Sequence, residues 1–478
     1  MRPGVAWAIA LAALLAGGAA RAAERSGPIV LIVIDTLRAD HLSCYGYPRP
    51  TSPEMCSLAR DGALFVRAFT SRTETTPAIA SMLTGLHPHR HGVQTLYLVL
   101  PEDMTTLAER LGGAGYRTGG FVSSFVMVRN FSGFDQGFEV YDDEVRTKEP
   151  FRENYERPAR ETVDRALAWL DGAGPRAFLF LHLIDPHGPY TPPQELVEKF
   201  ALPDDGRELP ADVRPYQRIP GVDHVSQYVG RYDGEIAHVD PQVGRVFSRL
   251  RERGWYDAAT IALVSDHGES MGEAGQWFHH GNSLHRAEAR VPLVIKWPRD
   301  AEAFPGAGAR VTRAVSVGDL FPTLLAAAGL EGAPAPATDL RAALSGEPAS
   351  GSPVSTYLPA EEGMMVAVRN ETCGAVWLLP WQRFGEKDPG AAAERRAWLA
   401  QAAEGVGNAS PACVARVVPE ALPLLEDLLD YRLATPVVSR LDVLRPGQRS
   451  RFIEQREGEV VPLSEQEKEA LRRLGYLE

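Results

Sequence analysis

The chain has 478 residues, and its 50 Lys+Arg against 62 Asp+Glu give a formal net charge of −12 at pH 7. Hydrophobic residues make up 44% and charged residues 23%, an ordinary globular composition that excludes wholesale disorder and fibrous structure. The acidic balance argues against nucleic acid as a partner, because proteins that bind a phosphate backbone usually carry a basic surface. A small anionic ester needs only a local positive site, so that class of ligand stays open.

The N-terminus has the three parts of a secretory signal peptide. Arg2 supplies a positive charge, Val5 to Ala16 form an apolar core of 12 residues, and Ala20-Arg21-Ala22 matches the A-x-A cleavage pattern. This core is shorter than the roughly 20 residues that a membrane-spanning helix needs, although an uncleaved anchor is the alternative. We therefore predict that residues 1–22 are cleaved, and that the mature protein is exported, periplasmic or secreted, and has no later membrane span.

Four cysteines occur in the chain, at Cys44, Cys56, Cys373 and Cys413. Export permits disulfides, and the most local of the three possible pairings joins Cys44 to Cys56 and Cys373 to Cys413. A protein of this length does not need crosslinks to fold, so four buried free thiols are the alternative.

Continuous apolar runs rich in β-branched and aromatic residues recur along the chain. Runs without alternation are typical of strands buried on both faces, as in a parallel sheet covered by helices. Helical patterns lie between them, so we predict an α/β fold with a mostly parallel central sheet flanked by helices. The predicted strands are Pro28–Ile34, Ala177–Ile184, Thr260–Val264 and Val291–Ile295, and the clearest helices are Arg157–Leu170 and Tyr228–Arg253.

The composition changes after the main domain. A helix over Val317–Gly329 is predicted to close a domain of residues 28–330, and a Pro/Ala-rich connection follows it. We predict a smaller α+β C-terminal subdomain over residues 353–478. Its predicted elements are short strands at Met364–Arg369 and Gly374–Leu379 and a final helix with a capping box of Ser464 and Glu467.

Three predicted strands end in polar, potentially reactive residues: Asp35, the segment His182–His187, and Ser265-Asp266-His267. In open α/β sheets, ligands bind beyond the carboxyl ends of the strands. The segment Ser71–Gly85 begins polar and continues as a helix, and its Pro77 suits the first helical position.

That placement puts Thr75 at a helix N-terminus, where the backbone N–H groups and the helix dipole favour an anion and lower the pKa of a hydroxyl. Two aspartates, one histidine and this hydroxyl together supply oxygen and imidazole ligands for a divalent cation. Such a cation would activate the hydroxyl and neutralise a bound oxyanion.

Several sequence blocks occur in a characteristic order. They are Asp35–Gly46 (DTLRADHLSCYG), Thr84–Gly92 (TGLHPHRHG), His182–Tyr190 (HLIDPHGPY), Val264–Glu269 (VSDHGE), and Gly281–His285 with Arg290–Leu293. This set resembles the sulfatase family of the alkaline phosphatase superfamily. The resemblance implies the α/β fold of that family, a catalytic domain over 28–330, and a metal-dependent hydrolase of sulfate, phosphate or phosphonate esters.

The resemblance also implies roles for individual residues. By position, Asp35, Asp266 and His267 match metal ligands, and Thr75 matches the nucleophile, which also contacts the metal. His187 matches the histidine that contacts the substrate oxyanion or the leaving group. Three further residues are weaker candidates: His280, near the position of a family lysine that contacts the oxyanion, and His182 and Asp185, close to the substrate.

The chain departs from the family pattern at the nucleophile. At this position the sulfatase family that the chain resembles has the motif C/S-x-P-x-R, whose Cys or Ser is oxidised to formylglycine. This chain has Thr75-Thr-Pro-Ala-Ile79 instead. Thr cannot yield that aldehyde, Ile79 cannot replace the arginine, and Thr36 stands where the second Asp of the usual pair would be. A sulfated formylglycine hydrate expels sulfate by elimination, a reaction that a sulfated Thr cannot undergo. A phospho-Thr, in contrast, can be hydrolysed by in-line attack of water at phosphorus. The nucleophile therefore favours phosphate or phosphonate esters, while the overall resemblance favours sulfate esters.

His267 favours Zn or Mn over Ca, because imidazole is a poor calcium ligand. We predict one divalent ion; a second would need further ligands, for which Asp185, His187 and His280 are the available residues. The expected partner is a small-molecule, glycan or lipid ester. Two other functions stay open: transfer of a phospho-group to an envelope lipid or glycan, and a catalytically silent binding protein of the same fold.

Overall fold

A computed structural model describes residues 27–344, apart from 97, 149–154, 300–306 and 333–336, together with short pieces between residues 354 and 425. The predicted signal peptide at residues 1–22, Cys373 and Cys413, and the predicted final helix at Ser464 lie outside the described residues. Within the described part of the chain, no helix combines the length and apolar character that crossing a membrane requires.

A nine-stranded sheet forms the centre of the molecule, in the order β12-β2-β11-β8-β1-β7-β3-β4, with β13 also paired to β2. The pairings of β1 with β7 and β8, and of β3 with β7 and β4, are parallel, whereas β11 runs antiparallel to both β8 and β2. The mostly parallel sheet is therefore confirmed. Its strands are β1 (Ile29–Ile34), β2 (Ala63–Phe69), β3 (Arg117–Phe121), β4 (Val140–Asp142), β7 (Ala177–Leu183), β8 (Thr260–Val264), β11 (Arg290–Lys296), β12 (Ala309–Val311) and β13 (Val315–Ser316).

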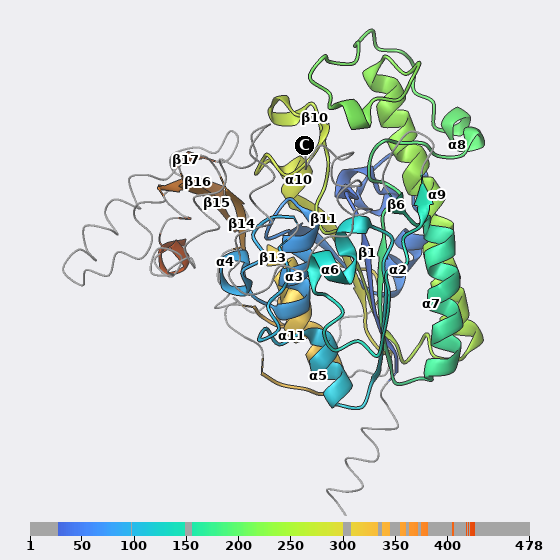
Figure 1. Cartoon of the computed structure of the whole chain (residues 1–478), viewed down its shortest axis with the longest axis vertical. Coiled ribbons are helices and arrows are strands. Elements are labelled where there is room, and N and C mark those ends of the chain that lie inside the picture. The colour runs from blue at the N-terminus through green and yellow to red at the C-terminus, as the bar shows by residue number, and fades with distance from the viewer. Residues whose placement is uncertain are drawn as a thin grey trace, which may run out of the picture.

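Helices cover both faces of this sheet (Figure 1). Alternate residues of β1 enter two different cores: Val30, Ile32 and Ile34 pack in one, and Ile29, Leu31 and Val33 in the other. Burial on both faces explains why this strand is a continuous apolar run rather than an alternating one. One layer contains α2 (Pro53–Asp61), α7 (Ala159–Ala173) and α9 (Val225–Glu252), and the other contains α3 (Thr75–Thr84), α5 (Leu107–Gly113) and α11 (Leu320–Ala327).

Shorter elements connect these layers and shape the edge of the sheet where its central parallel strands end. They are α4 (Pro88–His91), α6 (Arg129–Ser132), α8 (Gln194–Lys199), α10 (Arg286–Ala289), β5 (Thr147–Lys148), β6 (Tyr155–Glu156), β9 (Ser270–Met271), β10 (Trp277–His279) and single 3-10 turns such as Ser43–Tyr45. A disulfide joins Cys44 in that 3-10 turn to Cys56 in α2, which is the first of the two predicted pairings.

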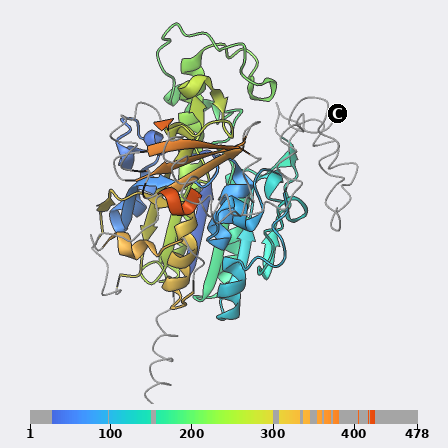
Figure 2. The ribbon, with the colours of Figure 1, turned by 90° about the vertical axis from the view of Figure 1, so that its left-hand side faces the viewer.

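A separate antiparallel sheet belongs to the C-terminal part of the chain. It is ordered β14 (Val354–Pro359), β15 (Gly363–Arg369), β16 (Gly374–Pro380) and β17 (Glu404–Gly405), and it has a small core of its own around Trp377. Figure 2 shows this sheet lying against the main domain. The contact is made by β14, where Tyr357 N donates to Ser71 O at 2.8 Å and Thr356 Oγ1 donates to Thr70 O at 2.7 Å. Segments just before α3 are therefore held by the second sheet.

Candidate functional site

Two neighbouring strands bring the predicted metal ligands together. Because β1 and β8 are parallel and in register, the residues that follow them emerge at the same edge of the sheet. Asp35 follows β1, and Asp266 and His267 follow β8. Each of the three offers a ligand atom within 4.8 Å of the others, and all three are buried. His267 Nε2 lies 3.8 Å from Asp35 Oδ1 and 3.5 Å from Asp266 Oδ2.

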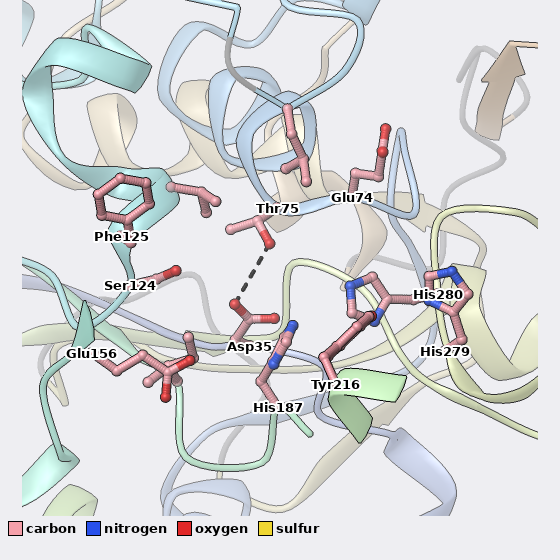
Figure 3. Close-up of a pocket in the computed structure, with 13 residues that line it drawn as sticks. Asp35, Glu74, Thr75, Ser124, Phe125, Glu156, His187, Tyr216, His279 and His280 are labelled. Atoms are coloured by element: carbon pink, nitrogen blue, oxygen red, sulfur yellow. Dashed lines mark hydrogen bonds between the residues drawn. The ribbon is translucent and has the colours of Figure 1, made fainter. Parts of the chain in front are cut away.

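Thr75 completes this cluster from the opposite side. Its Oγ1 lies 3.5 Å from Asp35 Oδ2, the contact marked in Figure 3. The same oxygen lies 3.4 Å from His267 Nε2. Helix α3 begins at Thr75 with Glu74 as its N-cap. Pro77 is therefore the third helical residue, whereas the sequence pattern predicts it at the first helical position. The difference is tolerated because the first four N–H groups of a helix have no intrahelical acceptor, and Pro lacks that group anywhere in the first turn.

The hydrogen bonds around these side chains leave their metal-facing atoms available. Asp266 Oδ1 accepts from the backbone N of His267 at 2.8 Å and of Thr36 at 3.3 Å, whereas its Oδ2 is buried without a hydrogen bond in the described part of the chain. His267 Nδ1 donates to Gly268 O at 3.0 Å, which leaves the lone pair of Nε2 toward Thr75. Buried carboxylates without a compensating charge are costly, so this donor set fits a divalent cation.

Burial keeps the imidazole of His267 neutral. It lowers the pKa of His267 to about 4, and a neutral ring is the form that coordinates a metal. Burial likewise lowers the pKa of His182 to about 4. His182 was predicted to contact substrate, but its Nε2 lies 3.6 Å from Asp35 Oδ2 and its ring is fully buried. It is absent from the described residues that line the pocket, and its contact with substrate stays a prediction.

The residue after Asp35 adopts a strained backbone. Thr36 has φ of +53°, in a left-handed region that a β-branched residue rarely enters. Two contacts hold it there: Tyr232 Oη donates to Thr36 O at 2.7 Å, and Thr36 N donates to Asp266 Oδ1. A strained backbone conformation of this kind persists only where surrounding contacts hold it in place, and such positions are often at functional sites. It lies at the turn that presents the Asp35 carboxylate.

A pocket of about 90 Å³ opens above Asp35 and Thr75. Figure 3 shows Ser124, Phe125 and Glu156 on one side of these two residues, and Tyr216, His279 and His280 on the other. The predicted residues Asp35, Thr75, His187 and His280 all line it, whereas motif reasoning did not identify the rest. The other described lining residues are Glu74, Leu96, Ser124, Phe125, Val126, Glu156, Ile184, Tyr216 and His279.

Two predicted histidines converge on this pocket. His187 Nδ1 lies 2.8 Å from Gly188 O, so it donates there, and the ring lines the pocket. The ring centres of His187 and His280 are 5.2 Å apart. His280 Nδ1 lies 3.1 Å from Glu269 Oε1, and Tyr190 Oη donates to the other oxygen of Glu269 at 3.1 Å. Burial opposes a charged His280, but the charge and hydrogen bond of Glu269 outweigh it and raise the pKa of His280.

The remaining sequence candidate has a structural position. Asp185 accepts hydrogen bonds from the backbone N of Ala159 at 3.1 and 3.2 Å, and so caps the N-terminus of α7. His279, which the sequence did not indicate, lines the pocket beside His280. Burial and then the neighbouring His280 lower the pKa of His279 to about 2, so it acts as a neutral hydrogen-bonding group.

Comparison with known proteins agrees with this architecture. The family model for sulfatases matches residues 28–330. The chain is 26% identical over 353 residues to an uncharacterized sulfatase of Escherichia coli K12, covering 63% of this chain and 68% of that protein. It is 25% identical over 383 residues to human iduronate 2-sulfatase, covering 63% of this chain and 69% of that enzyme. The phosphonate monoester hydrolase structure of Agrobacterium radiobacter superposes with a TM-score of 0.60 at 21% identity, over 78% of this chain and 94% of that chain.

A mostly parallel sheet gathers two carboxylates, an imidazole and a hydroxyl at its carboxyl edge, and the family model and the sulfatase relatives show a hydrolase of the sulfatase class. The chain belongs to the sulfatase family. Enzymes of this family bind a divalent metal, and the Asp35, Asp266 and His267 cluster is able to hold one.

Proposed function

We propose that this protein hydrolyses phosphate or phosphonate esters with Thr75 as the nucleophile, at one divalent ion held by Asp35, Asp266, His267 and the Thr75 hydroxyl. The observation that best supports this proposal is the position of Thr75 Oγ1, which lies 3.4 Å from His267 Nε2 and 3.5 Å from Asp35 Oδ2. Thr75 is the first residue of α3. Zn or Mn suits a site with an imidazole ligand better than Ca does.

When bound, the ion supplies Lewis-acid stabilisation of the ester oxygens and lowers the pKa of the nucleophilic hydroxyl. Thr75 would lose its hydroxyl proton to solvent before the reaction; its deprotonated Oγ1 attacks phosphorus, the bond to the leaving oxygen breaks, and a Thr75 phospho- or phosphono-ester and an alcohol form. His187 or His280, whose rings both line the pocket, gives a proton to the leaving oxygen. The same histidine then takes a proton from the water that attacks phosphorus in line, which releases the acid and restores Thr75.

The nature of the nucleophile supports phosphorus over sulfur. Thr75 replaces the Cys or Ser from which formylglycine forms, so elimination from an aldehyde hydrate has no counterpart here. A buried Ile79 stands at the position of the motif arginine. Neither change prevents attack of a hydroxyl at phosphorus, and the attack of water on a phospho-Thr needs no carbon–oxygen cleavage.

The deciding experiment compares nitrophenyl esters of sulfate, phosphate, a phosphodiester and a phosphonate, with Zn or Mn supplied. We expect the highest kcat/KM on a phosphorus ester and loss of that activity in Thr75→Ala. Highest activity on nitrophenyl sulfate would remove the substrate assignment, and an unchanged rate in Thr75→Ala would remove the nucleophile assignment.

The wider context of the protein is part of the same proposal. We propose an exported enzyme, periplasmic or secreted, in which residues 28–330 form the catalytic domain and 353–478 the C-terminal subdomain. Its substrate would be a small-molecule, glycan or lipid ester. The apolar core and A-x-A pattern of residues 1–22 support export, and N-terminal sequencing of the mature protein tests it: an intact residue 1 on exported material would contradict cleavage.

A further inference from the structure

A group of arginines lies outside the catalytic pocket, near the end of the main sheet that is formed by β12, β2 and β11. We call this group the arginine patch, and its members are Arg67 in β2, Arg286 in α10, Arg290 at the start of β11 and Arg310 in β12. Within the described part of the chain, none of the four forms an ion pair with a carboxylate, and none lines the pocket. Arg249 on α9, in contrast, pairs with two acidic side chains.

The four side chains form one concentration of positive charge. Arg286 begins α10 and Arg290 follows its last residue, a separation of four that places both on the same side. Partial burial, and then the charges of Arg290 and Arg67, lower the pKa of Arg286. Arg290 lies 5.8 Å from the centre of the Tyr45 ring. Burial raises the pKa of Tyr45, and the charges of Arg290 and Arg310 both act against that rise.

Backbone carbonyls hold two of these guanidinium groups in place. Arg310 Nη1 donates to Cys44 O at 2.9 Å, and Arg290 Nε donates to Val66 O at 3.0 Å. A guanidinium group has five N–H donors in a fixed plane, so each of these two keeps further donors for a ligand. Because the groups are already oriented, a ligand that accepts from them loses less free energy to the ordering of flexible side chains.

Two carboxylates close to the patch are directed at other groups. Glu288 in α10 accepts from Ser270 Oγ at 2.7 Å and from a backbone N–H at 3.0 Å. Glu273, whose charge acts on the N-cap residue His285 of α10, pairs with Arg38 at 2.8 Å. The described acidic side chains around α10 are therefore engaged away from the patch.

Arg369 in β15 adds a buried positive charge behind the patch. Its guanidinium lies 5.2 Å from the centre of the ring of Phe69, the residue that pairs with Arg290 between β2 and β11. Its Nη1 donates to Thr356 Oγ1 at 3.2 Å, and within the described residues it pairs with no carboxylate. Burial, and then the charge of Arg286, lower the pKa of Arg369 to about 9, so it keeps its charge at neutral pH.

The patch extends along neighbouring elements. Strands β12, β2 and β11, which carry Arg310, Arg67 and Arg290, are adjacent in the sheet. Adjacent strands lie about 4.8 Å apart, so these three strands span about 10 Å. One tetrahedral anion is too small to contact guanidinium groups spread over this distance, whereas a chain that carries several oxyanion groups can do so.

A lipid surface suits this patch less well than a narrow polymer. Among the described residues, Val140 in β4 is the only large hydrophobic side chain that is exposed, and β4 lies at the opposite end of the sheet. Stable attachment to a membrane usually combines basic residues with an apolar group that inserts. Arg67 and Arg290 are also only partly exposed, which favours a thin flexible chain over a flat surface.

We propose that the arginine patch binds an acidic polysaccharide through the carboxylate or sulfate groups of its sugars, at a site separate from the catalytic pocket. The inference is independent of the proposed function, because no residue of the patch lines the pocket. With a net charge of −12, the protein as a whole repels a polyanion, so contact is confined to a short stretch of the polysaccharide at the patch.

An acidic oligosaccharide without any phosphate or sulfate ester tests the proposal apart from catalysis. The metal-loaded wild type would be titrated calorimetrically with a galacturonate hexamer, with a sulfated dextran oligomer, and with neutral maltohexaose. We expect both acidic ligands to bind at low ionic strength and to bind more weakly as salt is added, because salt screens partly exposed charges. Maltohexaose should not bind.

The decisive variant is the double substitution Arg67→Gln with Arg286→Gln. Neither side chain forms a hydrogen bond with another described residue, so we expect the variant to fold, and thermal unfolding checks this. The dissociation constant for the galacturonate hexamer should rise about tenfold or more. The corresponding double substitution to Lys keeps both charges and should keep most of the affinity.

A matched control makes the same change in net charge elsewhere. Arg207→Gln with Arg299→Gln removes two exposed arginines that pair with aspartates, and the affinity should stay within about twofold of the wild type. The patch variant should also keep the wild-type kcat/KM on small nitrophenyl esters.

Four results would overturn the proposal. The first is failure of both acidic oligosaccharides to bind at low ionic strength, and the second is equal affinity in the patch variant and the control variant. The third is a parallel loss of kcat/KM on small esters in the patch variant, which would place the patch in the catalytic site. The fourth is binding to vesicles of phosphatidylglycerol and phosphatidylcholine that the patch variant loses while oligosaccharide binding is unchanged, which would assign the patch to a lipid surface.

Discussion

Thr75 is the residue on which the proposed chemistry depends, because its hydroxyl is the group that lies between Asp35 and His267. Thr75→Val replaces that hydroxyl with a methyl group of similar size. We expect kcat to fall by about three orders of magnitude or more, since the nucleophile is lost while packing at the start of α3 is kept.

Thr75→Ser is the matched variant, since it retains a hydroxyl at the same position. It should keep a measurable fraction of the rate and form a phospho-enzyme detectable by mass spectrometry after acid quench. Equal loss in the Ser and Val variants would argue that the methyl group, and not the hydroxyl, matters.

Asp266 supplies a buried carboxylate whose Oδ2 has no hydrogen bond in the described part of the chain. Asp266→Ala should therefore reduce bound metal to a small fraction of one equivalent, measured by elemental analysis after dialysis. Asp257→Ala, at an exposed residue, is the control and should keep the wild-type metal content. An Asp266→Ala protein that retains its metal would contradict the proposed ligand set.

At the scale of elements, the segment before α3 connects the two sheets. Thr70 and Ser71 accept hydrogen bonds from β14, and Arg72 donates to Gln94 O and pairs with Glu74, the N-cap residue of α3. The C-terminal sheet therefore contributes to the placement of Thr75 without contributing a residue to the described pocket lining.

Arg72→Gln tests this coupling between elements. The change leaves the half-buried Glu74 without its ion-pair partner and should cost on the order of 1–2 kcal/mol of stability. Because Arg72 positions the nucleophile and does not line the pocket, we expect kcat to fall about tenfold with little change in KM or metal content. Arg72→Lys should restore part of kcat. If Arg72→Gln lowered only the amount of folded protein, with a normal kcat per folded molecule, Arg72 would have only a structural role.

At the scale of the whole molecule, two buried carboxyl groups make stability depend on pH. Burial raises the pKa of Asp240, which accepts from the backbone N of Glu54 and Met55, from 3.8 to about 6. Burial also raises the pKa of Asp319, in the other layer, from 3.8 to about 6. The folded protein therefore holds these protons more strongly than the unfolded chain does.

The consequence has a definite sign. Each group contributes stability that is complete below about pH 4 and is lost as the pH rises to about 6, by at most about 3 kcal/mol per group. Asp240→Asn and Asp319→Asn, neutral at all pH values, should each remove part of this fall when urea unfolding is compared with the wild type at pH 4 and pH 7. The free energy of unfolding of the wild type minus that of the variant should fall between pH 4 and pH 7. A difference that stays constant or rises with pH would contradict the raised pKa of that carboxyl group.

Much of this organisation follows from local sequence. The strands β1, β7 and β8 were predicted because continuous apolar runs need burial on both faces, and Asp35, Asp266 and His267 were predicted because they follow such runs. The family membership was likewise predicted from motifs and is confirmed. The catalytic and binding roles of the site residues stay predictions, although the structure brings Thr75 and the three ligand candidates together.

Other features required the tertiary structure. The antiparallel direction of β11, the pairing of β14 with the segment before α3, and the capping role of Asp185 arise from contacts between residues far apart in the chain. The same is true of the pocket wall, since Ser124, Glu156 and His279 belong to separate segments without a recognisable spacing. The sequence by itself determined the central strands β1, β7 and β8, the residues that follow them and the family, because burial and backbone geometry act locally. Only the packed structure decided which loops surround Thr75 and with what charge, because loop placement depends on long-range contacts that no local pattern records.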